Sequence, residues 1–146
     1  MSIKASAVRF PIDAENIIRA ETEGALTAAG NTAGRDLGLL SAYWNEGDLA
    51  MPEQVAFVLF VTDLDTDDGD EEYTVEVQVA SDDAFSDAVS VLSAEITSTG
   101  NKTILVSRDQ VLDALDGAGH IRLRVTPAGT TPSITFWAIL SPIVGR

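Results

Sequence analysis

Residues 73–79 alternate strictly between apolar and polar side chains, and this pattern constrains the fold more than any other stretch. Successive side chains of a strand point to opposite faces of a sheet, so a period of two predicts a strand with one buried face. The face predicted to be buried consists of Tyr73, Val75, Val77 and Val79.

A second β-like run, residues 55–61, precedes this strand, and the ten residues 63–72 between them include seven acids. The three segments together predict a long β-hairpin with a charged, solvated tip. Residues 55–61 are apolar on both faces, whereas a strand of an ordinary sandwich has one polar face. We therefore expect the second face to lie under a covering loop or in a subunit contact, with ordinary core placement as the alternative.

Short β-like segments and turn clusters continue along the chain. Strands are predicted at residues 24–28, 36–43, 89–96, 103–106, 120–125 and 133–140, and turns at 30–34, 99–102 and 127–132. Residues 81–87 predict a helical turn or a tight loop pinned by Phe85. One short helix is predicted near residues 108–116, because Ser107 and Gln110 stand at the positions of a capping box.

About seven or eight strands with one short helix predict an all-β fold, an antiparallel β-sandwich of jelly-roll-like type. The length of 146 residues predicts a single domain over residues 1–146. Residues 1–23 give mixed signals, and we expect a short helical turn or an extended N-terminal arm there.

The composition narrows the classes of protein that fit. The chain has no cysteine, which excludes disulfides and zinc–thiolate sites and favours a reducing compartment. We find no signal-peptide pattern at the N-terminus and no apolar run long enough for a membrane span. The net charge of −14 predicts repulsion from phosphate backbones and anionic membranes, so we expect no direct nucleic-acid or membrane partner.

The acidic segment 63–72 is the one stretch that looks like a ligand site. Asp63, Asp65 and Asp67 match the opening of a calcium-binding EF-hand loop. The match then fails, because Gly69 stands one place late and no Glu occupies the twelfth position. We expect a solvated tip without a cofactor, and keep as the alternative a calcium site of another type, with Asp70 as the fourth ligand.

His120 is the only histidine, and with Arg122 and Arg124 it faces outward on the predicted strand 120–125. No Gly-x-Ser-x-Gly motif accompanies it, and no spacing singles out a carboxylate pair. We therefore predict that the protein is not an enzyme, with a small hydrolase as the least favoured alternative.

Arg122 and Arg124 form a small basic stripe on an acidic chain. The sequence leaves two interpretations open: cross-strand pairing with Glu72, Glu76 or Glu95, or an intersubunit contact with an acidic patch on a neighbouring copy.

The order of segments resembles the small cement, or decoration, proteins of tailed bacteriophage capsids. The resemblance covers most of residues 26–140, and its most suggestive block is Val-Gln-Val-Ala-Ser-Asp-Asp-Ala-Phe at 77–85. A strand at 121–125 followed by a Gly-containing turn and a final apolar strand also fits. The longer N-terminal lead and the Asp-rich segment are departures from the pattern.

The resemblance implies a homotrimer that is made in the bacterial host cytoplasm and sits on the outside of the virion. There it would stabilise contacts between neighbouring major capsid proteins, and burial of apolar area, at roughly 25 cal/mol per Å², would hold its copies together. The candidate subunit or capsid contacts are Phe57, Phe60, Arg122, Arg124, Phe136 and Trp137. The alternative is a carbohydrate- or calcium-binding β-sandwich module, with a tail-associated protein as one form of it.

Overall fold

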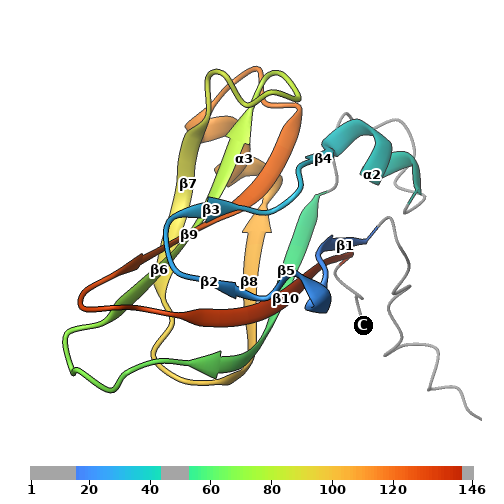
Figure 1. Cartoon of the computed structure of the whole chain (residues 1–146). Coiled ribbons are helices and arrows are strands. Elements are labelled where there is room, and N and C mark those ends of the chain that lie inside the picture. The colour runs from blue at the N-terminus through green and yellow to red at the C-terminus, as the bar shows by residue number, and fades with distance from the viewer. Residues whose placement is uncertain (1–15, 44–52, 143–146) are drawn as a thin grey trace, which may run out of the picture.

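The protein, seen in a computed structural model that describes residues 16–43 and 53–142, is an antiparallel β-sandwich (Figure 1). Two five-stranded sheets confirm the all-β prediction. The first sheet has the order β1 (Ile17–Arg19), β10 (Ile134–Pro142), β5 (Gln54–Leu64), β8 (Gly100–Ser107), and β2 (Ala25–Leu26) also pairs with β10. The second has the order β3 (Gly30–Asn31), β9 (His120–Ala128), β6 (Glu72–Ala80), β7 (Val89–Glu95), and β4 (Arg35–Asp36) also pairs with β9.

The predicted hairpin of residues 55–79 is wrong, although both of its strands exist. β5 pairs with β10 and β8 in the first sheet, whereas β6 pairs with β7 and β9 in the second. The acidic segment between them therefore connects the two sheets at one end of the sandwich (Figure 1). β5 is a central strand of the first sheet, because β10 and β8 are hydrogen-bonded to its two edges.

The core lies between the sheets and consists of the inward faces of the long strands. Tyr73, Val75, Val77 and Val79 are all at most 1% exposed, which confirms the period-two prediction for β6. The same alternation holds in β9, where Ile121, Leu123 and Val125 are buried. In β5 the inward residues are Val55, Phe57, Leu59 and Val61.

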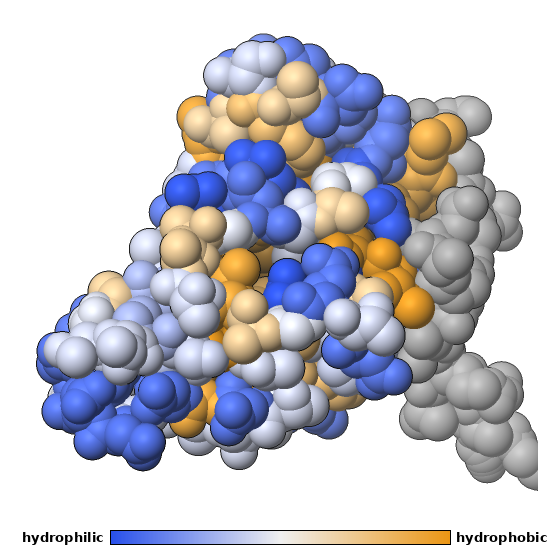
Figure 2. Space-filling view, viewed as in Figure 1, coloured by the Kyte–Doolittle hydropathy of each residue, from blue (hydrophilic) through white to orange (hydrophobic). Residues whose placement is uncertain are grey.

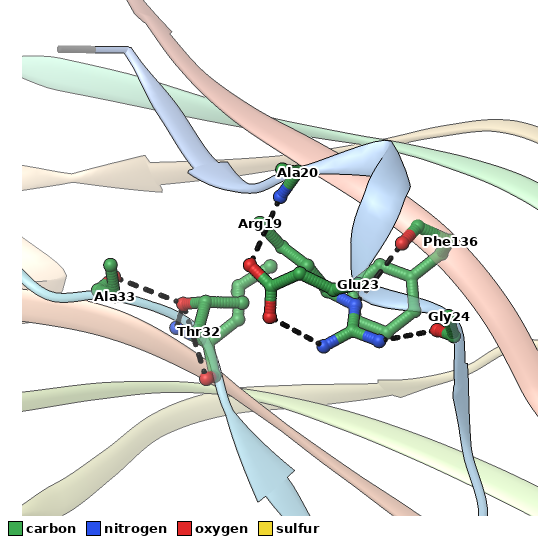
Figure 3. A network of polar contacts seen from close by, with 8 residues as sticks. Arg19, Ala20, Glu23, Gly24, Thr32, Ala33 and Phe136 are labelled. Atoms are coloured by element: carbon green, nitrogen blue, oxygen red, sulfur yellow. Dashed lines mark hydrogen bonds and ion pairs between the residues drawn. The ribbon is translucent and has the colours of Figure 1, made fainter. Parts of the chain in front are cut away.

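The N-terminal segment runs along one side of the sandwich, from β1 and β2 on the first sheet to β3 and β4 on the second. Buried Arg19 fixes its start, because its Nε and Nη2 donate to the carbonyls of Phe136 and Gly24 at 3.1 and 2.7 Å (Figure 3). Glu23, in the 3-10 helix η1 (Glu21–Glu23), forms an ion pair with Arg19 at 3.4 Å.

Thr32 ties the same segment to the second sheet. Its hydroxyl accepts a hydrogen bond from the Leu123 N–H at 3.0 Å and lies near the carbonyl of Ala33 (Figure 3). The turn predicted at residues 30–34 is therefore partly wrong, since Gly30 and Asn31 pair with β9 as β3. The short strand predicted at 24–28 is confirmed in part, since β2 covers Ala25–Leu26.

The strand predicted at residues 36–43 is wrong, because α2 (Leu37–Tyr43) is a helix. The Asp36 carboxylate accepts a hydrogen bond from the Leu39 N–H at 3.1 Å, as an N-cap residue does. Leu37 and Leu40, three residues apart, are both buried, while Leu39 is 70% exposed. This spacing is typical of a helix that buries one side.

The helix predicted near residues 108–116 is confirmed as α3 (Arg108–Ala114). Ser107 and Gln110 form the expected capping box, with hydrogen bonds of 3.2 and 2.9 Å. Val111 is buried, but Leu112 is 38% exposed and does not lie on the buried side of α3.

The residues described form ten strands rather than seven or eight, because the short strands β1, β3 and β4 had no recognisable strand pattern. Strand β8 begins at Gly100, inside the predicted turn at 99–102, and β9 extends to Ala128. The predictions for residues 1–15 of the N-terminal arm lie outside the described residues.

Candidate functional site

The outer face of the first sheet carries an aromatic pair. Phe60 of β5 and Trp137 of β10 lie directly opposite each other, and their rings stack with centroids 4.1 Å apart at 15°. Val58 occupies the next outward position of β5, and Leu105 of β8, directly opposite Ala56, is 53% exposed. We call Val58, Phe60, Leu105 and Trp137 the outer apolar face. Outward positions of a two-layer sandwich are usually polar, so this face is distinctive.

Two of the candidate contacts do not belong to this face. Phe57 is fully buried and Phe136 is 3% exposed, and both pack in the core between the sheets. Neither is available to a partner, so these two predictions are withdrawn. Most of the apolar surface that we expected to join copies is used by the core of a single chain.

His120, Arg122 and Arg124 lie on the outer face of the second sheet, at alternate positions of β9, and we call them the basic stripe. The Arg122 Nε donates to the Gln78 Oε1 at 2.9 Å, and an Arg124 guanidinium nitrogen donates to the Asn31 Oδ1 at 3.0 Å. Burial lowers the pKa of Arg122, and the neighbouring charge of Arg124 lowers it further. The two guanidinium groups therefore lie side by side, and each is hydrogen-bonded to a neutral side-chain amide.

The 81–87 loop packs against this stripe and confirms the tight loop predicted there. Phe85 is 8% exposed, and the Arg122 guanidinium lies 4.2 Å from its ring centroid, a cation–π contact. The His120 ring lies edge-on to Phe85 at 6.3 Å. Phe85 reaches this position with a φ of +56°, and Gly34 makes room for it, since a Cβ there would lie 2.5 Å from the ring.

The cross-strand ion pairs that we considered for the stripe do not form. Glu76 stands opposite Arg124 in the register, yet the ion pair found within the described residues is that of Arg19 with Glu23. Glu76 instead accepts a hydrogen bond from the Gln78 amide at 3.4 Å. Glu72 lies opposite Ala128, and Glu95 lies on β7, beyond β6.

The acidic segment forms a loop whose carboxylates are largely held by backbone and hydroxyl groups. Asp70 accepts hydrogen bonds from the N–H and the hydroxyl of Thr130, at 3.0 and 2.7 Å. Glu71 accepts from the N–H groups of Asp68 and Gly69. In the view of Figure 2, hydrophilic residues gather at this end of the molecule. The loop is thus fastened to the neighbouring 129–133 loop.

These contacts bear on the calcium alternative. Asp65 accepts from the N–H of Asp67, and Asp70 faces Thr130, so neither carboxylate points toward a shared centre. Within residues 16–43 and 53–142, no three metal-ligating side chains converge. The two hydrogen bonds from Thr130 lower the pKa of Asp70, which keeps its carboxylate charged and bound to the loop.

Tyr73 fixes the base of the loop, a role that the sequence pattern did not indicate. Its hydroxyl accepts from the Ser133 N–H at 3.0 Å and lies within hydrogen-bond distance of the Asp65 carbonyl. Tyr73 is a core residue by its ring and a loop anchor by its hydroxyl, as buried tyrosines often are.

A hollow of about 360 Å³ opens between the edge strands β7 and β8. Its floor includes core side chains such as Leu59 and Val75, and its rim includes Glu95 and Lys102. Lys102 is engaged with the Ser98 hydroxyl at 2.7 Å. His120, on β9 and separated from β7 by β6, does not line this hollow, so the two features do not form one site.

No protein-family model matches the chain, and no curated protein shows significant similarity to it. Among the helices in the described part of the chain, none has the length and apolar character needed to cross a membrane.

Proposed function

We propose that the protein is a structural virion protein that decorates the outside of a bacteriophage capsid as a homotrimer. In this role it binds the major capsid protein and stabilises contacts between neighbouring shell subunits. The observation that carries the proposal is the stacked pair Phe60–Trp137 on the outer face of a sandwich sheet. The resemblance of the segment order to capsid cement proteins supports the same conclusion.

Aromatic side chains are enriched where proteins meet, because they bury a large area at a small loss of conformational freedom. Phe60 and Trp137 are already stacked, so little ordering remains when a partner covers them. We propose that the outer apolar face binds the capsid shell. The stripe and the acidic loop then remain accessible for other contacts.

The test is co-sedimentation with empty capsid shells of the phage that encodes the chain, together with light scattering of the free protein. We expect the wild type to be a trimer and to pellet with the shells. Trp137→Ser with Phe60→Ser should raise the dissociation constant for the shells at least ten-fold, about 1.4 kcal/mol of binding free energy. Leu112→Ser, which removes an exposed leucine from α3, is the matched control and should bind normally.

Two results would contradict the proposal. One is a wild-type protein that stays in the supernatant at micromolar concentration, and the other is a clean monomer. Equal binding by the Trp137 variant and the control would show that the outer apolar face is not the surface that contacts the shell.

The second candidate function is a carbohydrate-binding module, and the same half-buried aromatic pair favours it, since sugars stack on aromatic rings at a protein surface. Titration of the free protein with bacterial surface glycans, followed by tryptophan fluorescence, distinguishes the two. A saturable change that is lost in Trp137→Ser would favour the carbohydrate function over the capsid function.

A further inference from the structure

The basic stripe is the feature of the surface that the proposed function does not use. On a chain of net charge −14, Arg122 and Arg124 lie next to each other on one face of β9. Their described partners are the neutral amides of Gln78 and Asn31. A guanidinium that already holds one amide still presents further N–H donors suited to a carboxylate. The stripe is therefore prepared for an acidic ligand that a single chain does not supply.

The nearest carboxylate in the register is engaged elsewhere. Glu76 stands opposite Arg124 but bonds with Gln78. Phe85 holds Arg122 from the other side and limits the positions that its guanidinium can take. Because these contacts already hold the arginine side chains in place, binding of a ligand costs little side-chain conformational entropy.

The same chain carries a complementary surface at the end of the sandwich. Three exposed carboxylates of the 63–72 segment accept no hydrogen bond from the described residues, namely Asp63, Asp67 and Glu72. The other acids hold the loop in shape, through Thr130 and the loop backbone. The loop thus holds these three carboxylates at fixed places on the surface.

We propose that the basic stripe of one copy binds the acidic loop of the next copy, with Arg122 and Arg124 pairing with Asp63 and Asp67. This inference rests on the proposed trimer and names the surfaces that join its subunits. A cyclic trimer needs two different patches that meet head to tail, because only a two-fold interface pairs a patch with itself. Stripe and loop are two such patches of opposite charge, at different places on one molecule.

The overall charge favours a protein loop over nucleic acid as the occupant. A nucleic acid would bring its phosphates close to many acidic groups of a protein with a net charge of −14. A loop of a second copy brings only a few carboxylates to the two arginines and keeps the other acidic groups of the two copies farther apart. The capsid shell is the remaining source of carboxylates, and the experiment distinguishes it, since the free protein contains no shell.

The experiment exchanges charges and measures the mass of the purified full chain by light scattering. Arg122→Glu/Arg124→Glu should lower the mass three-fold, to that of a monomer, and so should Asp63→Lys/Asp67→Lys. The chain with all four changes has the wild-type net charge and restores opposite charges at every interface, so it should again be a trimer.

The matched control places the lysines elsewhere. Asp113→Lys/Asp116→Lys, at exposed positions in and just after α3, combined with Arg122→Glu/Arg124→Glu, also has the wild-type net charge and should remain a monomer. Arg124→Glu with Asp67→Lys is a milder pair in case loss of the Arg122–Phe85 contact prevents folding, which circular dichroism would report.

The outcomes separate the two proposals. A trimeric wild type whose stripe and loop variants also remain trimers overturns this inference and leaves the proposed function standing. A monomeric wild type overturns the trimer itself. Recovery of the trimer in the α3 control would show that net charge, rather than the stripe and the loop, governs assembly.

Discussion

Arg19 and Asp70 show how single polar residues hold the ends of this sandwich together. Arg19 is buried, and its guanidinium also lies 4.7 Å from the Phe136 ring centroid. It bonds the carbonyl of a residue 117 positions away in sequence. Burial of a guanidinium costs free energy unless its N–H groups are hydrogen-bonded, so the first sheet and the N-terminal segment depend on each other.

Asp70 makes the stability of the molecule sensitive to acid. The hydrogen bonds from Thr130 lower its pKa in the folded protein, so this carboxylate adds stability when the pH is above its unfolded value. That stability is lost as the pH falls below about 4 and through the lowered folded value. We expect Asp70→Asn to melt below the wild type at pH 7, and the difference to shrink at pH 3.

Thermal melts followed by circular dichroism measure this difference, with Asp113→Asn as the control. Asp113 is exposed and makes no hydrogen bond with the described residues, so its variant should follow the wild type at both pH values. A difference between Asp70→Asn and the wild type that stays constant from pH 7 to pH 3 would contradict the assignment.

The capping box of Ser107 and Gln110 was predictable because both partners lie within four residues of each other in sequence. The roles of Arg19 and Tyr73 were not, since their partners come from distant segments that only the fold brings together. A lone arginine between apolar residues carries no local signal of where its acceptors lie.

Among the secondary-structure elements, α2 is a helix that the sequence pattern wrongly predicted to be a strand. Residues 36–43 are mostly apolar, and a short apolar run does not distinguish a strand from a buried helix. The signal that distinguishes them is Asp36, which caps the helix through the Leu39 N–H. We expect Asp36→Ala to lower the free energy of unfolding by about 1 kcal/mol.

Asp36→Asn is the informative comparison, because an asparagine Oδ1 can accept the same hydrogen bond. Its stability in urea denaturation should lie close to that of the wild type. If both variants lost the same stability, the charge of Asp36 rather than its capping bond would be responsible.

The pairing of β5 and β6 was a different kind of error. Each strand is where the pattern placed it, but sheet partners are chosen by the packing of the whole chain. The seven-residue link 65–71 is longer than a tight hairpin turn, and its hydrogen bonds run to the 129–133 loop. The length of this link was the feature of the sequence that indicated that β5 and β6 belong to different sheets.

For the whole molecule, the division of residues between core and surface decides which candidate contacts remain. Alternation along β5 and β10 separates Phe57 from Phe60 and Phe136 from Trp137, but it does not say which face of a doubly apolar strand is inside. That choice depends on the second sheet, which covers one face only. Outward placement of Arg122 and Arg124 was predictable, because their neighbours Ile121, Leu123 and Val125 leave one buried face.

Net charge acts on the molecule as a whole and sets the response to cations. A compact chain of charge −14 repels itself, so screening by any salt should raise its melting temperature. A specific calcium site would add a further, saturating stabilisation. Because Asp65 bonds within its own loop and Asp70 bonds to Thr130 of the neighbouring loop, we expect millimolar calcium chloride to raise the melting temperature no more than magnesium chloride at equal concentration. A larger rise with calcium, abolished in Asp65→Asn and Asp70→Asn but not in Asp113→Asn, would mean that the loop rearranges around the ion.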